Sequence, residues 1–542
     1  MTADGPITTM TPFHNVNCPH GFILSAVSGS LKVCHLPPKE RLDCPWLLRK
    51  VRLAGSGSVQ RLALMKEAGL LAVAVMRTMA SRPRLAEEPG GDPHATAAYV
   101  TAEVVSQAKG KEEGQEVRLL ELPGCSPAGG ARPLLCGPGE LVTCLRQVAL
   151  LLPDLGNAQV TGSNPAAARA AAAAVGADGY TPLLAVGTTT MMGEDYPCLG
   201  RTYLYRVDRQ QRSQADGSPA DPTYSTVLLA QRDMAGGVSS LVELKGLMAV
   251  AVGKSLELFS LRPAGQRSQQ TALPLVLIKV AFFDLPVLIT SMALVKDFFL
   301  VGDVAKGLAF LRYNESSKLL EQLGRDFDNR DTTAAGFVIN ATKLLFASAD
   351  ASGTLRQYEY VRSHPASWNG QKLVPGGSLH CGHLVTRLLS LRLAVQDGSN
   401  RQGLLLGSLD GSLHTWLPVW DMAAAGRLAA LQALLPCALP HTAGLNPRSF
   451  RRRHLLTPRS LGGGETWGSQ QAPDTATPPP GVLPSLHAYT GSLMLDGDLL
   501  VRFAQLPRPQ QLAVAQRLGA NGSTITDSIL SDLAALRVAT GL

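Results

Sequence analysis

The stretch Asp297–Tyr313, DFFLVGDVAKGLAFLRY, consists of two apolar runs separated by a short turn. Lys306 and Gly307 lie in that turn, and glycine readily takes the positive φ that a tight hairpin turn requires. The second apolar run ends on an aromatic residue, Tyr313. This arrangement predicts a β-hairpin.

The same pattern recurs along most of the chain. Further copies occupy Gly21–Leu36, Gly246–Leu261, Leu344–Tyr360 and Gly403–Pro418, and a longer version occupies Leu183–Val207. Apolar and polar residues alternate in Ser412–Trp416, as is typical of a half-buried strand. The later turns recur about every 45 to 60 residues, which is the spacing of four-stranded propeller blades with loops of variable length. The sequence therefore predicts an all-β, WD40-like propeller, and a β-sandwich with irregular loops is the alternative.

Three aromatic residues end the later hairpins. We expect Tyr313, Tyr360 and Trp416 to pack between adjacent blades, where burial of their rings would stabilise the fold. The most apolar stretch, Leu273–Val295, contains Lys279 and two prolines, so it predicts two buried strands and no membrane span.

The hydrophobic period changes near the end of the chain. Helical spacing is found in the segments around residues 499–506, 512–518 and 525–536, which predicts a small α-helical domain. The stretches 81–96 and 163–179 are of low complexity and are expected to be loops. Residues 456–490, rich in glycine and proline, are expected to form a flexible insertion.

The composition indicates a globular protein. The 542 residues include 45% hydrophobic residues, and 50 Lys and Arg against 42 Asp and Glu give a formal net charge of +8. This modest positive excess favours an anionic partner without identifying one. The nine cysteines are scattered and form no CxxC pair, which suits a reducing compartment. The first residues lack the basic and apolar regions of a secretory signal.

The sequence offers little for catalysis. It contains no P-loop, GxSxG or HExxH motif, and we expect no catalytic residue, cofactor, metal or small-molecule substrate. His380, Cys381 and His383 have metal-ligand chemistry, but neighbouring strand residues point to opposite faces, so we expect no metal site there. The remaining acidic candidates are predicted to be solvated loop residues: Glu194, Asp195, Asp326, Asp328 and Asp331.

The densest basic segment lies just before the insertion. Its candidate contact residues are Arg448, Phe450, Arg451, Arg452 and Arg453. Arginine binds phosphate through its planar fork of donors, and a phenylalanine ring can stack on a base. The segment therefore predicts contact with RNA or with a partner protein; a solvated surface is the alternative.

Several strings of the sequence resemble one known family. They are TPFHNVNCPHGF (11–22), CPWLLRKVRL (44–53), VGTTTMMGEDYPCLGRTYLYRVD (186–208), DFFLVGDVAKGLAFLRYNESSKLL (297–320), GLNPRSFR (444–451) and LDGDLLVRF (495–503). These strings resemble the largest subunit of the cleavage and polyadenylation specificity factor. That family is similar in turn to the large subunit of the damaged-DNA-binding complex and to a propeller subunit of splicing factor 3b.

The resemblance implies a fold and a function. Family members carry three seven-bladed propellers followed by a helical domain. By resemblance, residues 1–43 would close a preceding, mostly absent propeller, residues 44–435 would form a seven-bladed propeller, and residues 436–542 would form the helical end. The implied function is a nuclear, non-enzymatic scaffold in pre-mRNA 3′-end processing that binds other subunits of the factor, with direct pre-mRNA contact secondary and no role at a membrane. A propeller adaptor of a ubiquitin ligase or DNA-repair complex, or a splicing scaffold, is the alternative.

Overall fold

The computed structural model describes a set of separate stretches of the chain. They are residues 7–13, 21–26, 31–34, 53, 58–78, 113–122, 125–137, 139–152, 180–190, 198–210, 222–264, 273–393, 395, 398–439, 453–454, 494–519 and 521–540. The chain divides into two compact units, residues 1–50 with 541–542, and residues 51–540.

The described part of the smaller unit is a three-stranded antiparallel sheet. Its strands, in order, are β1 (Ile7–Phe13), β2 (Gly21–Ala26) and β3 (Leu31–Cys34). The β2–β3 pair is the hairpin predicted for Gly21–Leu36. A register shift between Ile7 and Thr9 leaves Thr8 as a β-bulge in the first strand.

The larger unit contains five antiparallel sheets among its described residues, four of which are single meanders. The first comprises β4 (Val59–Met65), β5 (Leu70–Thr78), β6 (Glu113–Glu121), β7 (Ser126–Pro127) and β8 (Leu134–Leu135). The second comprises β9 (Glu140–Leu151), β10 (Tyr180–Thr190), β11 (Leu199–Gln210) and β12 (Thr223–Met234). The third comprises β13 (Val238–Leu244), β14 (Leu247–Val252), β15 (Ser255–Pro263) and β16 (Leu275–Asp284). The fourth comprises β17 (Ile289–Val295), β18 (Phe298–Asp303), β19 (Gly307–Asn314) and β20 (Leu319–Arg325).

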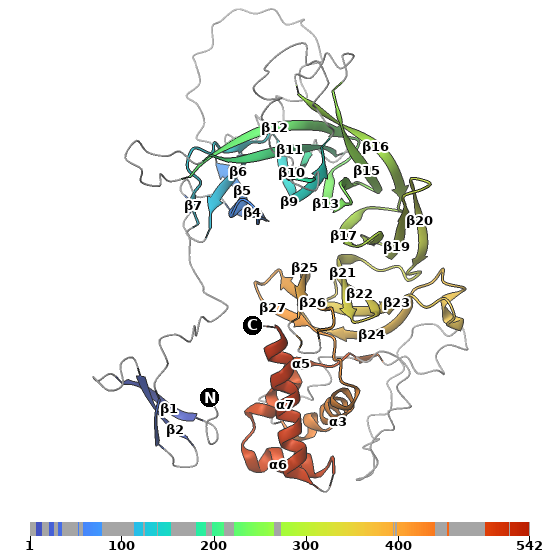
Figure 1. Cartoon of the computed structure of the whole chain (residues 1–542). Coiled ribbons are helices and arrows are strands. Elements are labelled where there is room, and N and C mark those ends of the chain that lie inside the picture. Colours follow the sequence, from blue (N-terminus) through green and yellow to red (C-terminus); the bar gives the residue numbers. More distant parts are fainter. Residues whose placement is uncertain are drawn as a thin grey trace, which may run out of the picture. The chain divides into compact units, whose positions relative to one another are not determined.

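The fifth sheet joins two meanders. One consists of β21 (Thr332–Asn340), β22 (Lys343–Asp350), β23 (Thr354–Glu359) and β24 (Val374–His380). The other consists of β25 (Val385–Arg392), β26 (Arg401–Ser408) and β27 (Leu413–Trp416). Two residue pairs between β21 and β26 connect them, and the short β28 (Arg453–His454) adds to β24. The sheets follow one another in sequence order, as the colours of Figure 1 show.

The β-hairpin predicted for Asp297–Tyr313 is confirmed. Phe298 of β18 faces Arg312 of β19, and Asp303 faces Gly307 across the turn. Gly307 takes φ +74°, which a side chain would strain. The apolar stretch Leu273–Val295 likewise forms two strands, β16 and β17, as predicted. The prediction that both are buried is only partly right, because Ile278 and Phe282 of β16 are exposed.

The hydrophobic core lies between the facing surfaces of successive meanders. One cluster joins β9–β12 to β13–β16 and another joins β13–β16 to β17–β20, so the meander β13–β16 buries both of its faces. Tyr313 is buried in the second of these clusters. Tyr360 packs on Phe310, with ring centroids 5.3 Å apart, and Trp416 packs on a further cluster of β21, β22 and β26. The predicted packing of the three aromatic residues is confirmed.

A bulged hydroxyl residue links each of several meanders to the next. The register of β9, β17 and β21 shifts at a threonine near the start of the strand: Thr143, Thr290 and Thr333. The Thr290 hydroxyl lies 3.2 Å from the Gly302 carbonyl of its own meander and 2.6 Å from the Thr332 carbonyl of the following one. Thr143 and Thr333 lie within hydrogen-bond distance of the equivalent pairs of carbonyls. We refer to these three residues as the bulge threonines.

Helices form the end of the described chain. The three predicted segments are α5 (Gly497–Gln505), α6 (Arg508–Gln516) and α7 (Gly522–Thr540), which pack with α3 (Met422–Ala438) around Leu431 and Phe503. Helical structure thus begins at Met422, earlier than the predicted change at residue 436. The Asp421 side chain caps this helix by accepting from the Ala423 amide. No helix in the described stretches is long and apolar enough to cross a membrane.

The protein therefore has an all-β, propeller-like fold with a small helical part after it. The described residues of the larger unit provide six meanders, four in separate sheets and two in the fifth sheet. The blade count of seven and the other domain boundaries stay predictions. The stretches 81–96, 163–179 and 456–490 lie outside the described residues.

Candidate interaction site

The predicted basic segment lies almost wholly outside the described residues. Nothing is described of Arg448, Phe450, Arg451 or Arg452. The backbone of Arg453 belongs to β28, where it pairs with Leu379 of β24. The role of these residues in binding stays a prediction.

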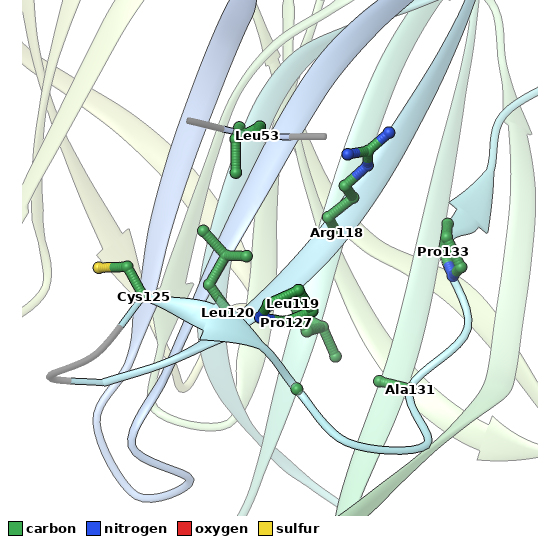
Figure 2. A pocket seen from close by; sticks show the side chains of 9 residues that line it. Leu53, Arg118, Leu119, Leu120, Cys125, Pro127, Ala131 and Pro133 are labelled. Carbon is green, nitrogen blue, oxygen red and sulfur yellow. The ribbon is translucent and has the colours of Figure 1, made fainter. Parts of the chain in front are cut away.

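A small pocket lies against the first meander. It has a volume of about 340 Å³ and is lined mainly by apolar residues of β6, β7 and the segment after them (Figure 2). The charged group in its wall is Arg118, whose guanidinium pairs with Glu116. The other side chain of chemical interest is Cys125, and no histidine or carboxylate stands beside it among the residues that line the pocket. The pocket therefore offers apolar contact rather than a catalytic pair.

The His380–His383 segment does not converge on one point. His380 lies 3.3 Å from the Thr354 hydroxyl, while the Cys381 thiol donates to the Gly353 carbonyl. His383 contacts Asp410, with 2.6 Å between Nδ1 and Oδ2. Across the described stretches of the chain, no group of three His, Cys, Asp or Glu side chains is placed to hold a metal ion.

Two thiols of the larger unit favour their protonated form. Burial raises the pKa of Cys144 to about 12, and burial together with the nearby Glu140 raises the pKa of Cys136 to about 12. A thiol with so high a pKa provides almost no thiolate at neutral pH. Neither residue has the chemistry of a nucleophile.

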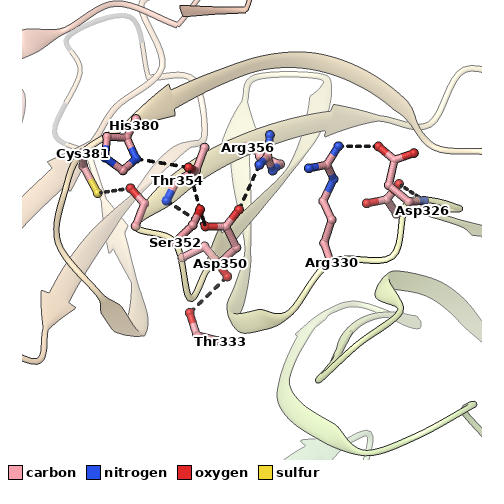
Figure 3. A network of polar contacts seen from close by, with 12 residues as sticks. Asp326, Arg330, Thr333, Asp350, Ser352, Thr354, Arg356, His380 and Cys381 are labelled. Carbon is pink, nitrogen blue, oxygen red and sulfur yellow. Dashed lines mark hydrogen bonds and ion pairs between the residues drawn. The ribbon is translucent and has the colours of Figure 1, made fainter. Parts of the chain in front are cut away.

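Carboxylates at the ends of two strands anchor the turns that follow. The Asp350 Oδ1 accepts from the Ser352 hydroxyl at 2.5 Å and from the Thr354 amide at 2.9 Å, and its Oδ2 pairs with Arg356 at 3.0 Å (Figure 3). Asp303 plays the same part after β18, where it accepts from the amides of the β18–β19 turn and from the Val287 amide of the preceding connection. These acids fix loop geometry on the sheets.

The prediction that Asp326 is a solvated loop acid is wrong. Its side chain is buried between the fourth and fifth sheets and accepts a hydrogen bond from the Tyr358 hydroxyl at 2.8 Å. Burial raises the pKa of the Asp326 carboxyl above its ordinary value, and the Tyr358 hydrogen bond opposes that rise. Asp328 pairs with Arg330, and Asp331 is exposed as expected. Glu194 and Asp195 lie outside the described residues.

Sequence reasoning also missed two features of this region. Each bulge threonine directly follows a β-branched residue near the start of the first strand of its meander. This two-residue pattern could have located them in the sequence: Val142-Thr143, Ile289-Thr290 and Thr332-Thr333. Trp368, an exposed aromatic residue, stands in the polar string SHPASWNGQ, where a large apolar side chain is unexpected. The bulge threonines join neighbouring meanders, and Trp368 lies on the surface.

These observations define a class of protein. Antiparallel meanders follow one another along the chain, and strand-end carboxylates anchor turns on two of them. The class is that of all-β, propeller-like proteins.

Comparison with known proteins gives the family. A family model described as the CPSF A subunit region matches residues 161–505, which is more than half of the chain, so the chain belongs to this family. It is similar to a probable cleavage and polyadenylation specificity factor subunit 1 of Oryza sativa subsp. japonica, with 30% identity over 531 residues, 96% of this chain and 32% of the relative. It is also similar to the cleavage and polyadenylation specificity factor subunit 1 of Arabidopsis thaliana, with 30% identity over 99% of this chain and 32% of the relative. A more distant relative is the protein cft1 of Neurospora crassa, 29% identical over 62% of this chain and 21% of the relative. The chain thus spans about a third of the length of its plant relatives.

Proposed function

We propose that this chain acts as part of a non-enzymatic scaffold subunit of the nuclear complex that cleaves and polyadenylates pre-mRNA. The observation that carries the proposal is the similarity to relatives named as subunit 1 of the cleavage and polyadenylation specificity factor, which extends along nearly the whole chain. Its partners would be other subunits of that factor. None of the relatives described above is named as a ubiquitin-ligase adaptor, a DNA-repair protein or a splicing factor, which are the alternative roles.

The fold supports a scaffold physically. The bulge threonines join three meanders to the following ones, and strand-end carboxylates fix two of the turns, so partner-binding loops on these meanders would keep their positions without a bound ligand. A preorganised surface loses less conformational entropy when a partner binds. Within this proposal, residues 1–43 close a preceding propeller, the residues from 44 up to α3 form a propeller, and the helical end, predicted from residue 436, already includes α3 from Met422. The basic residues 448–453 contact RNA or a partner subunit.

Affinity purification tests the proposal directly. The tagged chain would be expressed in cells, purified from nuclear extract, and its partners identified by mass spectrometry. We expect cleavage and polyadenylation subunits to be recovered. A matched control is Leu300→Asp, which places a carboxylate at a fully buried core position and should lose these partners with the fold. Recovery of a cullin ligase or of splicing-factor subunits instead would refute the proposal.

A further inference from the structure

Two neighbouring exposed aromatic rings, with one cation at each end, form a row between the fourth and fifth sheets. The Arg325 guanidinium lies 4.6 Å from the centroid of the Phe327 ring, and the Phe327 and Trp368 ring centroids are 4.9 Å apart. The Lys372 ammonium lies 5.0 Å from the centroid of the Trp368 ring. We call these four residues the aromatic row. Cation–π attraction orients the rings at both of its ends.

The backbone holds the aromatic row in place. The 3-10 helix η1 (Pro365–Ser367) precedes Trp368, and the buried Ser367 hydroxyl donates to the His364 carbonyl at 2.7 Å. The loop is tied to the end of β20, because the Arg325 amide donates to the Gln371 carbonyl at 2.9 Å and the Leu373 amide donates to the Arg325 carbonyl at 3.0 Å. The backbone therefore holds the aromatic row in its conformation without a bound ligand.

Trp368 has an unfavourable backbone conformation. Its φ of 49° and ψ of 53° lie in the left-handed region, which is strained for a bulky side chain. The Trp368 ring is not buried in return for this strain: 53% of Trp368 is exposed, and 37% of the neighbouring Phe327. The exposed Trp368 ring adds little to the hydrophobic core, so core packing does not explain the strained backbone. We therefore infer that the ring is exposed in order to bind a ligand.

The electrostatic surroundings of the row favour an anionic ligand. No acidic group in the described stretches forms an ion pair with Arg325, Lys372 or the exposed Arg362 on the same loop. The carboxylates that follow Arg325 in sequence are engaged elsewhere: Asp326 is buried against Tyr358, and Asp328 is paired with Arg330. Among the described residues, the cations around the rings therefore have no acidic ion-pair partner.

We propose that the aromatic row is a stacking platform for unpaired bases of single-stranded RNA. Rings of this kind stack on bases of any sequence, while neighbouring cations follow the phosphates. In segments 326–331 and 361–372, Phe327 and Trp368 are the only exposed large apolar side chains, so the surface lacks the apolar area that a peptide interface would bury. The inference deepens the proposed function, on which it rests, by giving the scaffold a place where pre-mRNA would pass.

The test measures binding of the full chain to a fluorescein-labelled oligouridine of about 12 nucleotides by fluorescence anisotropy. Trp368→Asn removes the ring and keeps a residue that tolerates the left-handed region, so it should fold normally. We expect affinity to fall roughly 5- to 100-fold, and Trp368→Phe to retain most of it. The matched control is Phe282→Ala: this exposed ring of β16 also carries a cation, Lys279, but that cation is paired with Glu257, so we expect no change.

Two further measurements separate stacking from charge. An oligonucleotide of the same length with abasic sites should bind the unaltered chain more weakly, and Trp368→Asn should abolish the difference between the two ligands. Replacing Lys372 and Arg362 with Gln should flatten the slope of log affinity against log salt by about 0.7 for each phosphate that these cations neutralise in the unaltered chain.

The outcomes distinguish this inference from the proposed function. Unchanged oligouridine affinity in Trp368→Asn would overturn the stacking platform, even if the chain still co-purifies with polyadenylation subunits. Loss of a protein partner with RNA affinity intact would overturn it in favour of a protein interface. Failure of the unaltered chain to recover those subunits would refute the proposed function instead.

Discussion

The Tyr358→Phe substitution tests the buried hydrogen bond between the fourth and fifth sheets. It removes the hydroxyl that donates to Asp326 over 2.8 Å and leaves the ring in place. Both side chains are buried, so no water replaces the missing donor readily. A hydrogen bond to a charged group contributes about 1.5 to 3 kcal/mol, and we expect local stability to fall by about that amount at neutral pH.

The effect should depend on pH. Burial raises the pKa of Asp326 in the folded protein, so the stability contributed by this group is present below its ordinary pKa and is lost as the pH rises through its folded pKa. The Tyr358 hydrogen bond opposes that rise because it favours the ionised carboxylate. Tyr358→Phe should therefore destabilise the protein more at neutral pH than at about pH 4.

Hydrogen exchange of peptides from β20 to β23 gives the local measurement. A decrease of about 1.5 to 3 kcal/mol corresponds to a fall in amide protection of roughly 10- to 100-fold. Tyr313→Phe is the control, since Tyr313 is also buried but its hydroxyl has no hydrogen-bond partner among the described residues; it should change stability by less than about 0.5 kcal/mol. Equal effects of the two substitutions, or a larger effect of Tyr358→Phe in acid, would refute the reasoning.

Three other predictions concern the fold and the basic segment. Thr290→Val removes a bulge hydroxyl and should cost about 1 to 2 kcal/mol, measured as a shift of the urea midpoint at constant slope; no shift would show that the hydroxyl does not stabilise the link between meanders. Replacing Arg451, Arg452 and Arg453 with Ala should flatten the salt dependence of RNA binding by up to about 2 without changing sequence preference, and selective loss of AAUAAA binding would contradict this. Deleting residues 456–490 should leave soluble expression and circular dichroism unchanged, because their composition offers little to bury. Insoluble protein would show that the stretch is structural.

Much of the fold could be predicted because its signals are local. Alternating apolar residues and glycine turns located hairpins such as β18–β19, and helical spacing located α5, α6 and α7. The helix α3 was missed because its apolar residues cover all sides, as its alanine- and leucine-rich sequence shows, and leave no single stripe to detect.

The site was harder to predict because its geometry depends on long-range contacts. Asp326 has the sequence surroundings of a loop acid, and its burial results from Tyr358, which lies on another strand. Trp368 and Phe327 are brought together only when the loop after β23 pairs with the end of β20. Periodicity within one segment carries no information on such pairs.

The bulge threonines also bear on how the protein avoids aggregation. The first strand of several meanders has one edge without a neighbouring strand among the described residues, and a free edge is a template on which another chain can add a strand. A bulge breaks the regular spacing of donors and acceptors along that edge. Where the hydroxyl of one meander reaches a carbonyl of the next, as Thr290 does at Thr332 and Thr333 does at Val385, that acceptor is also occupied. The hydrogen bond that joins neighbouring meanders thus makes their edges poor sites for intermolecular pairing, which benefits a chain built so largely from strands.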